Sequence, residues 1–287
     1  MKSYKEFIKE SIKESIESIC QRHRITHYTI NSDGSIDVDG NVYLDYQELT
    51  KLPLKFQNVT GDFNCQNNKL TTLEGSPKIV DGNFYCQRNQ LTTLEGGPKS
   101  VAGHFYCSNN KLTTLEGGPK SVGGDFDCQF QDSQLTTLEG SPQIVGGGFI
   151  CHNNKLTTLE GGPKSVGSFF SCRNNQLTTL EGGPKSVGGY FYCQDNQLID
   201  FNGLPEDFEE FVYLQRNPVE EIYNLFVDSA TTEYTAKKLR LQKCIKWLNE
   251  FDVIQGDKVI MDRLEEVYHQ MGMDVPENIT LKHYEII

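Results

Sequence analysis

The centre of the chain repeats one pattern of hydrophobic and polar positions. The unit reads FxCxxNxLTTLEGGPKSVGG and begins, in one clear copy, at Phe84. Its cysteines follow one another at intervals of 21, 21, 21, 23, 21 and 21 residues: Cys65, Cys86, Cys107, Cys128, Cys151, Cys172 and Cys193. The same step finds degenerate copies at residues 42–49 and 212–219. A fixed period of this kind predicts a tandem array of nine coils that stack on one another.

Each unit has a strand-like half and a turn-rich half. Phe and Cys are separated by one residue. Because side chains alternate between the two faces of a strand, both should point into the core. The segment LEGGPKSVGG contains too much glycine and proline for a helix. The spacing of Phe, Cys, Asn and Leu matches the leucine-rich pattern LxxLxLxxNxL. The predicted fold is a leucine-rich repeat solenoid of about nine 21-residue coils, with short parallel strands on the concave side and an extended or turn-like convex side.

Both flanks of the array have the period of helices. Apolar residues recur every three or four positions between Tyr4 and Cys20, and again at residues 244–251 and 260–271. A solenoid needs caps over its core ends. We therefore expect an N-terminal helical cap at 1–35, the solenoid at 36–219 and a helical C-terminal cap at 220–287. Two alternatives stay open: the N-terminal helix binds a partner, or the C-terminal helices fold back over the concave face.

The cysteine and asparagine columns are predicted to be structural. Equivalent residues of stacked strands lie about 4.8 Å apart, but their side chains point parallel, and a disulfide needs converging ones. Buried, reduced cysteines that pack as small hydrophobic residues are the better interpretation. The asparagines stand where the chain leaves the strand, and a side-chain amide there can satisfy backbone groups that would otherwise lack partners.

Composition excludes several classes of protein. The 287 residues carry 39 acidic and 27 basic side chains, a net charge of -12, which disfavours binding to nucleic acid. No segment is apolar over the roughly 20 residues that a membrane span requires, and the first residues do not form a signal peptide. We expect a cytoplasmic protein with no membrane partner. The sequence does not predict an oligomeric state.

Motifs for catalysis or cofactor binding are missing from the sequence. There is no phosphate-binding glycine loop, HExxH, CxxC or GxSxG motif. The six histidines are dispersed, and His104 and His152 stand two coils apart on the predicted concave face. We therefore predict no catalytic residue, no cofactor and no metal ligand, and a protein that is not an enzyme.

The positions that vary between the coils are predicted to form a binding face. Repeat proteins place their binding residues on the variable positions of a shared scaffold. These positions are rich in Tyr and Phe, which are enriched at protein interfaces; packing along the sheet and neutral drift are the alternatives. The candidate protein-binding residues are Tyr85, Tyr106, Phe130, Ile150, His152, Phe169, Arg173, Tyr190, Tyr192, Phe211 and Tyr213. We expect those from Ile150 onward to form one continuous apolar and aromatic patch edged by charge.

One coil is two residues longer than its neighbours. Between Cys128 and Leu135 the sequence reads QFQDSQ, with Ser133 where the asparagine is expected. Such an insertion belongs at the edge of a coil. It either presents Phe130 outward as an anchor for a partner or is a tolerated change without function.

The repeats and flanks resemble known proteins. Short coils with NQLTTL and a proline on the return segment are similar to the 20 to 22 residue leucine-rich repeats of secreted bacterial effectors. Residues 28–56, the exit NPVEEIYNLF at 217–226 and the tail from residue 251 resemble leucine-rich repeat proteins of tailed bacteriophages. The resemblance implies a viral accessory protein in the host cytoplasm, and it implies no reaction or site residue.

Two functions follow from these observations. The first is a non-enzymatic module that binds a host or phage protein through its concave face, for example to inhibit a host defence factor. The alternative is a structural or assembly component of the virion.

Overall fold

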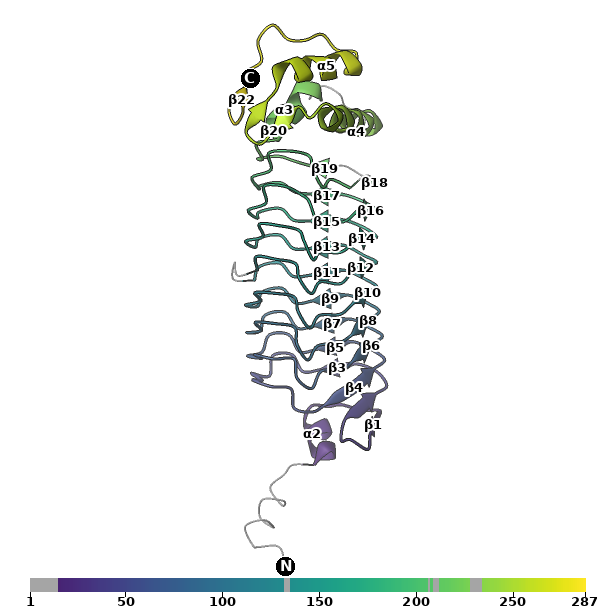
Figure 1. Ribbon diagram of the computed structural model, residues 1–287. Coiled ribbons are helices and arrows are strands. Elements are labelled where there is room, and N and C mark those ends of the chain that lie inside the picture. Colours follow the sequence, from purple (N-terminus) through teal and green to yellow (C-terminus); the bar gives the residue numbers. More distant parts are fainter. Residues whose placement is uncertain (1–14, 132–134, 206, 209–211, 228–233) are drawn as a thin grey trace, which may run out of the picture.

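The computed structural model is a long stack of coils with a helical region at each end (Figure 1). It describes residues 15–131, 135–205, 207–208, 212–227 and 234–287. Each coil contributes one short strand to each of two parallel sheets, and the sheets run along the length of the stack.

The first sheet contains the strands that the repeat predicts. Phe and the variable residue after it pair in register with the same positions one coil away, as Phe105 does with Phe84 and Phe126. The sheet has nine strands, which confirms the predicted nine coils. They are β3 (Val42–Tyr43), β5 (Phe63–Asn64), β7 (Phe84–Tyr85), β9 (Phe105–Tyr106), β11 (Phe126–Asp127), β13 (Phe149–Ile150), β15 (Phe170–Ser171), β17 (Phe191–Tyr192) and β19 (Val212–Tyr213).

The return segment forms a second sheet, where the sequence predicted only extended or turn-like backbone. Its valine points inward and the residue before it outward: Val101 is buried and Ser100 is exposed. The strands are β1 (Tyr28–Ile30), β2 (Ile36–Val38), β4 (Phe56–Val59), β6 (Ile79–Val80), β8 (Ser100–Val101), β10 (Ser121–Val122), β12 (Ile144–Val145), β14 (Ser165–Val166), β16 (Ser186–Val187) and β18 (Asp207–Phe208). All pairs in this sheet are parallel except β1 with β2.

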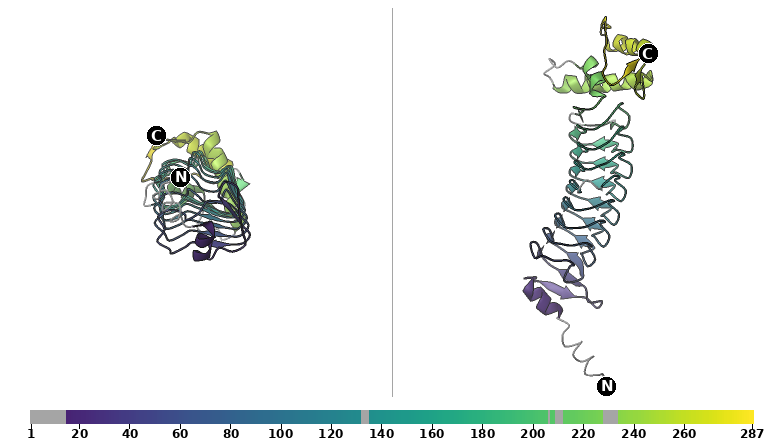
Figure 2. Two further views of the ribbon diagram at one scale, coloured as in Figure 1. Left: turned by 90° about the horizontal axis from the view of Figure 1, so that it is seen from below. Right: turned by 90° about the vertical axis from the view of Figure 1, so that its left-hand side faces the viewer.

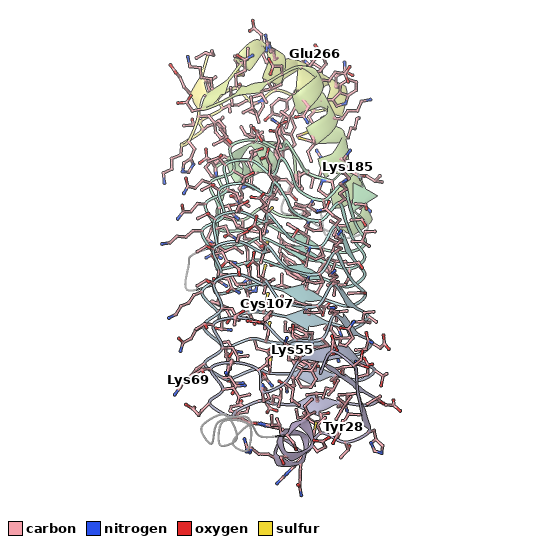
Figure 3. All side chains as sticks on the ribbon, turned by 60° about the horizontal axis from the view of Figure 1, so that its bottom comes forward. Tyr28, Lys55, Lys69, Cys107, Lys185 and Glu266 are labelled. Carbon is pink, nitrogen blue, oxygen red and sulfur yellow. The ribbon has the colours of Figure 1, made fainter. Side chains whose placement is uncertain are left out.

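The core is a set of identical ladders. Consecutive phenylalanine rings from Phe63 to Phe191 stack with centroids 5.0 to 5.5 Å apart. The ladder cysteines are fully buried, as predicted, and so are the repeat leucines between Leu70 and Leu198. Figure 3 shows Cys107 inside the stack and Lys69 at its outer edge.

The asparagine column connects neighbouring coils, as predicted. The amide of Asn110 donates to the carbonyls of Cys107 (2.9 Å) in its own coil and Cys86 (3.1 Å) in the previous one. Its side-chain oxygen accepts from the N–H of Leu91 at 3.1 Å. The equivalent carbonyls, one in the same coil and one in the previous coil, accept from Asn68, Asn89, Asn154, Asn175, Asn196 and Asn217.

In the long coil, Gln131 and not Ser133 takes the place of the asparagine. Its side-chain amide donates to the carbonyls of Cys107 (2.9 Å) and Cys128 (3.2 Å), and its oxygen accepts from the N–H of Leu112 (3.3 Å). The glutamine follows Cys128 by the same three residues that separate Cys and Asn elsewhere. The extra residues therefore come after the column position, and Ser133 lies outside the described residues.

The two ends of the stack differ in content. At the N-terminal end, α2 (Ile16–Arg22) buries Cys20 against the core. The C-terminal region contains α3 (Glu220–Phe226), α4 (Tyr234–Glu250), β20 (Ile254–Gln255), β21 (Lys258–Val259), α5 (Met261–Met271) and β22 (Glu285–Ile286). Helices α4 and α5 overlap the two predicted helical patterns, whereas α3 and the small sheet of β20, β21 and β22 were not predicted individually. The rest of the predicted N-terminal helix lies outside the described residues, and the predicted domain boundaries stay a prediction.

The buried thiols predict how the native protein reacts. All nine cysteines are free and buried, and burial raises the pKa of Cys86, Cys107 and the other ladder thiols well above the ordinary value. Reactivity needs an accessible thiolate. We expect a maleimide to label none of the ladder cysteines until the protein is denatured, as measured by mass spectrometry. A Lys111→Cys variant, whose thiol would be exposed, is the positive control. Native disulfides or rapid native labelling would contradict the prediction.

Candidate functional site

The outer side of the nine-stranded sheet, named here the strand face, carries the predicted binding residues. Three columns of side chains run along it, two residues apart within each coil. Of the predicted residues, Phe130 (46%) and Tyr190 (38%) expose the largest fractions of aromatic side chain, and His152 is nearly buried at 9%. Tyr85, Tyr106, Ile150, Phe169, Tyr192 and Tyr213 are half-buried, and Arg173 is exposed. Phe211 lies outside the described residues.

The first column has a structural role that sequence reasoning missed. At this position, three residues before each ladder cysteine, the side chain accepts a hydrogen bond from the backbone N–H of the same position in the next coil. For example, Asn83 accepts from the N–H of His104 at 2.7 Å. The accepting residues are Asn41, Asp62, Asn83, His104 and Asp125. One signal was available, because all five side chains can accept hydrogen bonds.

This acceptor column ends at Asp125, which accepts from the N–H of Gly148 at 2.6 Å. The next described members are Gly148, Phe169 and Tyr190. No side-chain acceptor of this kind meets the N–H of Phe169 or Tyr190 among the described residues. Gly148 instead leaves room for a ring: a Cβ there would lie 2.5 Å from the ring of Phe169. The column thus changes from hydrogen-bond acceptors to aromatic rings.

The aromatic residues of the last coils contact one another. Tyr192 and Tyr213 stack with centroids 5.0 Å apart, and Tyr190 lies 5.7 Å from Tyr192 and 6.0 Å from Tyr213. Phe169 meets Tyr192 edge-on at 6.3 Å. Partial burial and the neighbouring tyrosines raise the pKa of Tyr192. These four residues are named here the aromatic cluster.

Tyr85 and Tyr106 form a separate group. Their rings stack at 5.5 Å, and His104 stacks on Tyr106 at 5.5 Å. In the next coil, Asp127 takes the position of these tyrosines. Its carboxylate accepts hydrogen bonds from the N–H and the side-chain amide of Gln129. Burial raises the pKa of this carboxyl. This tyrosine pair lies outside the patch predicted from Ile150 onward, and Asp127 follows it in the same column.

Phe130 and His152 form a third feature at the long coil. Phe130 has a left-handed backbone (φ 51°), which bulky residues rarely adopt. Its ring meets that of His152 edge-on at 5.7 Å. Burial, together with the charge of Arg173, lowers the pKa of His152 to about 4. His152 is therefore a neutral, largely covered base beneath an exposed phenylalanine.

The C-terminal helices do not cover the strand face. Figures 1 and 2 show α3, α4 and α5 on the end of the stack, beyond β19. Tyr190 keeps its exposed surface next to them. The alternative that these helices bury the aromatic cluster is thus not what the fold adopts.

The described part of the chain offers little to a metal ion. It contains no group of three or more His, Cys, Asp or Glu side chains that could hold one. None of its helices is long and apolar enough to cross a membrane.

The two sheets, the asparagine column and the 21-residue coils define a leucine-rich repeat solenoid, a class of scaffold that presents an extended surface to proteins. No protein-family model and no curated protein matches the chain. Among solved structures, YopM from Yersinia enterocolitica WA-314 is similar, with 17% sequence identity and a TM-score of 0.40. The similarity covers 75% of this chain and 56% of the YopM chain, so this chain spans little more than half the length of YopM.

Proposed function

We propose that this protein is a non-enzymatic binding module that holds a partner protein through the aromatic cluster. The observation that carries the proposal is the change along the first column of the strand face. In the early coils this column joins neighbouring coils by hydrogen bonds, and in the late coils it carries Phe169 and Tyr190 instead.

The change replaces hydrogen bonds between the coils by contacts between rings on the surface of the sheet. A hydrogen bond of this kind contributes about 1 kcal/mol, and an acceptor such as Asn or Asp would provide it. An exposed aromatic group gives up that bond and places apolar surface in water. Apolar patches on a protein surface mark interaction sites, and tyrosine is enriched among the residues that dominate binding energy.

The biological setting is part of the same proposal. Resemblance of the flanks to bacteriophage leucine-rich repeat proteins supports an accessory role in the cytoplasm of the infected host. The partner is then a host or phage protein, such as a host defence factor that the module inhibits. The alternative is a virion component, favoured by the length of the stack, which suits a spacer (Figure 1). Capture of partners by the intact protein and mass spectrometry of purified virions distinguish the two.

Truncation of two residues of the cluster is expected to weaken binding strongly and leave the fold intact. In a Phe169→Ser, Tyr192→Ser double variant, the captured partner should bind at least about 30-fold more weakly, because truncating a central anchor costs about 2 kcal/mol or more. The melting temperature should fall only slightly, since both side chains are half-buried on the outside of the sheet and neither belongs to the core. Titration calorimetry and thermal unfolding measure the two effects.

The separate tyrosine pair provides the matched control. A Tyr85→Ser, Tyr106→Ser variant removes the same kind of surface from the other group and should bind as the wild type does. Unchanged binding by the Phe169, Tyr192 variant, or a large loss of its stability, would contradict the proposal.

A further inference from the structure

Among the described residues of the three outward columns of the strand face, Arg173 is the only lysine or arginine. Over the nine coils these columns carry four carboxylates, Asp45, Asp62, Asp125 and Asp127, and this one guanidinium. Arg173 stands beside the aromatic cluster, two residues after Ser171, which pairs in register with Tyr192. The cluster thus has one positive charge at its edge, on a face that is otherwise acidic.

The fold uses most of the carboxylates but not the guanidinium. Asp62 accepts from the N–H and the amide of Asn83, and Asp125 accepts from the N–H of Gly148. The side chain of Arg173 is exposed and makes no hydrogen bond or ion pair with any described residue. Arg216, in contrast, pairs with Asp195 at 2.7 Å.

The residue type at this position is not required by the coil. The same column carries glutamine in five other coils, at Gln66, Gln87, Gln129, Gln194 and Gln215. The charge of Arg173 reaches both neighbouring coils, since it acts on the pKa of His152 on one side and of Tyr192 on the other. An arginine here therefore adds an unpaired charge at the edge of the aromatic cluster, where the coil does not require one.

On this basis, which rests on the proposed function, we infer that Arg173 determines the specificity of the site by binding a carboxylate of the partner protein. The partner segment carries an Asp or Glu next to an apolar side chain that packs on the aromatic cluster. A guanidinium matches a carboxylate with two parallel hydrogen bonds. Phosphorylated segments are recognised by clusters of arginines, and Arg173 stands alone, which favours the carboxylate.

The inference is tested with random peptides displayed as a library and selected on the full-length protein. Clones are kept when their binding is lost on the Phe169→Ser, Tyr192→Ser variant. We expect these peptides to be enriched in Asp or Glu next to apolar residues. Selection on Arg173→Gln should lose the acidic preference, and selection on Arg173→Glu should replace it with Lys or Arg. Arg173→Gln installs the residue found in five other coils, so it should fold normally.

Affinities of single peptides give the size of the effect. Changing the acidic residue of a selected peptide to its amide should weaken binding to the wild type about tenfold or more, and should not affect binding to Arg173→Gln. Two results would overturn the role of Arg173 but leave the proposed binding face standing. One is a set of cluster-dependent peptides without acidic enrichment; the other is an equal loss of peptide affinity on the wild type and on Arg173→Gln. Failure to obtain any cluster-dependent peptide would overturn the proposed binding face, and this inference with it.

Discussion

Replacing Asn110 by alanine is expected to destabilise the protein by about 3 kcal/mol or more. The side chain is 1% exposed and satisfies two cysteine carbonyls and the N–H of Leu91. Alanine leaves the N–H of Leu91 without a partner, which costs about 1 to 3 kcal/mol. It also removes one of the two amide bonds to each cysteine carbonyl, worth about 1 kcal/mol each, although Cys86 keeps the bond from Asn89 and Cys107 keeps that from Gln131. Because these bonds join the coil of Asn110 to the previous coil, the loss weakens the stacking between these two coils.

Chemical denaturation followed by circular dichroism measures this loss. Lys111→Ala is the matched control: it truncates the next residue, which is exposed, and should leave stability within about 0.5 kcal/mol of the wild type. If Asn110→Ala unfolds at the same denaturant concentration as this control, the asparagine column does not hold the coils together.

Replacing Gly117 by alanine should have a comparably large effect through steric clash. Gly117 has a left-handed backbone (φ 82°), and a Cβ there would lie 2.4 Å from the N and Cα atoms of Glu95 in the previous coil. The neighbouring backbone cannot move without separating the two coils. Conformational strain and overpacking each cost about 1 to 3 kcal/mol, so we expect a loss of about 3 kcal/mol, measured as a lower melting temperature and denaturation midpoint.

The next glycine, Gly118, provides the control for this variant. Its position is occupied by Ser76 and Ser141 in two other coils, where the hydroxyl donates to a carbonyl of the following coil. Gly118→Ser should therefore be tolerated. A Gly117→Ala protein as stable as Gly118→Ser would show that the coils are not held as closely at this corner as the structure describes.

The two variants also bear on function. The aromatic cluster draws its residues from three successive coils, Phe169, Tyr190 with Tyr192, and Tyr213, and the ring contacts exist because the coils are held in register. The ladders that stabilise the solenoid thus fix the spacing of the proposed anchors. A partner that binds them meets a surface that is already ordered, which lowers the entropic cost of binding.

Sequence alone determined the repeating interior. Stacked copies of one coil must place identical residues above one another, so the 21-residue period was sufficient to predict nine strands, the buried cysteine ladder and the bonding role of Asn110 and its equivalents. The helical regions at both ends followed from their apolar period of three to four residues, because an amphipathic helix records its buried face in local spacing.

Tertiary structure decided the features that depend on contacts between coils. The hydrogen bond from a backbone N–H to the side chain one coil earlier, as between His104 and Asn83, joins residues 21 apart and is not visible in the local pattern. The replacement of the expected asparagine by Gln131 depends on the reach of a longer side chain. The ring contacts that join Phe169, Tyr190, Tyr192 and Tyr213 link three successive coils, and the uncovered cluster follows from where the last helices pack. Each of these is set by the direction of side chains and the packing of distant segments, which hydrophobic periodicity does not encode.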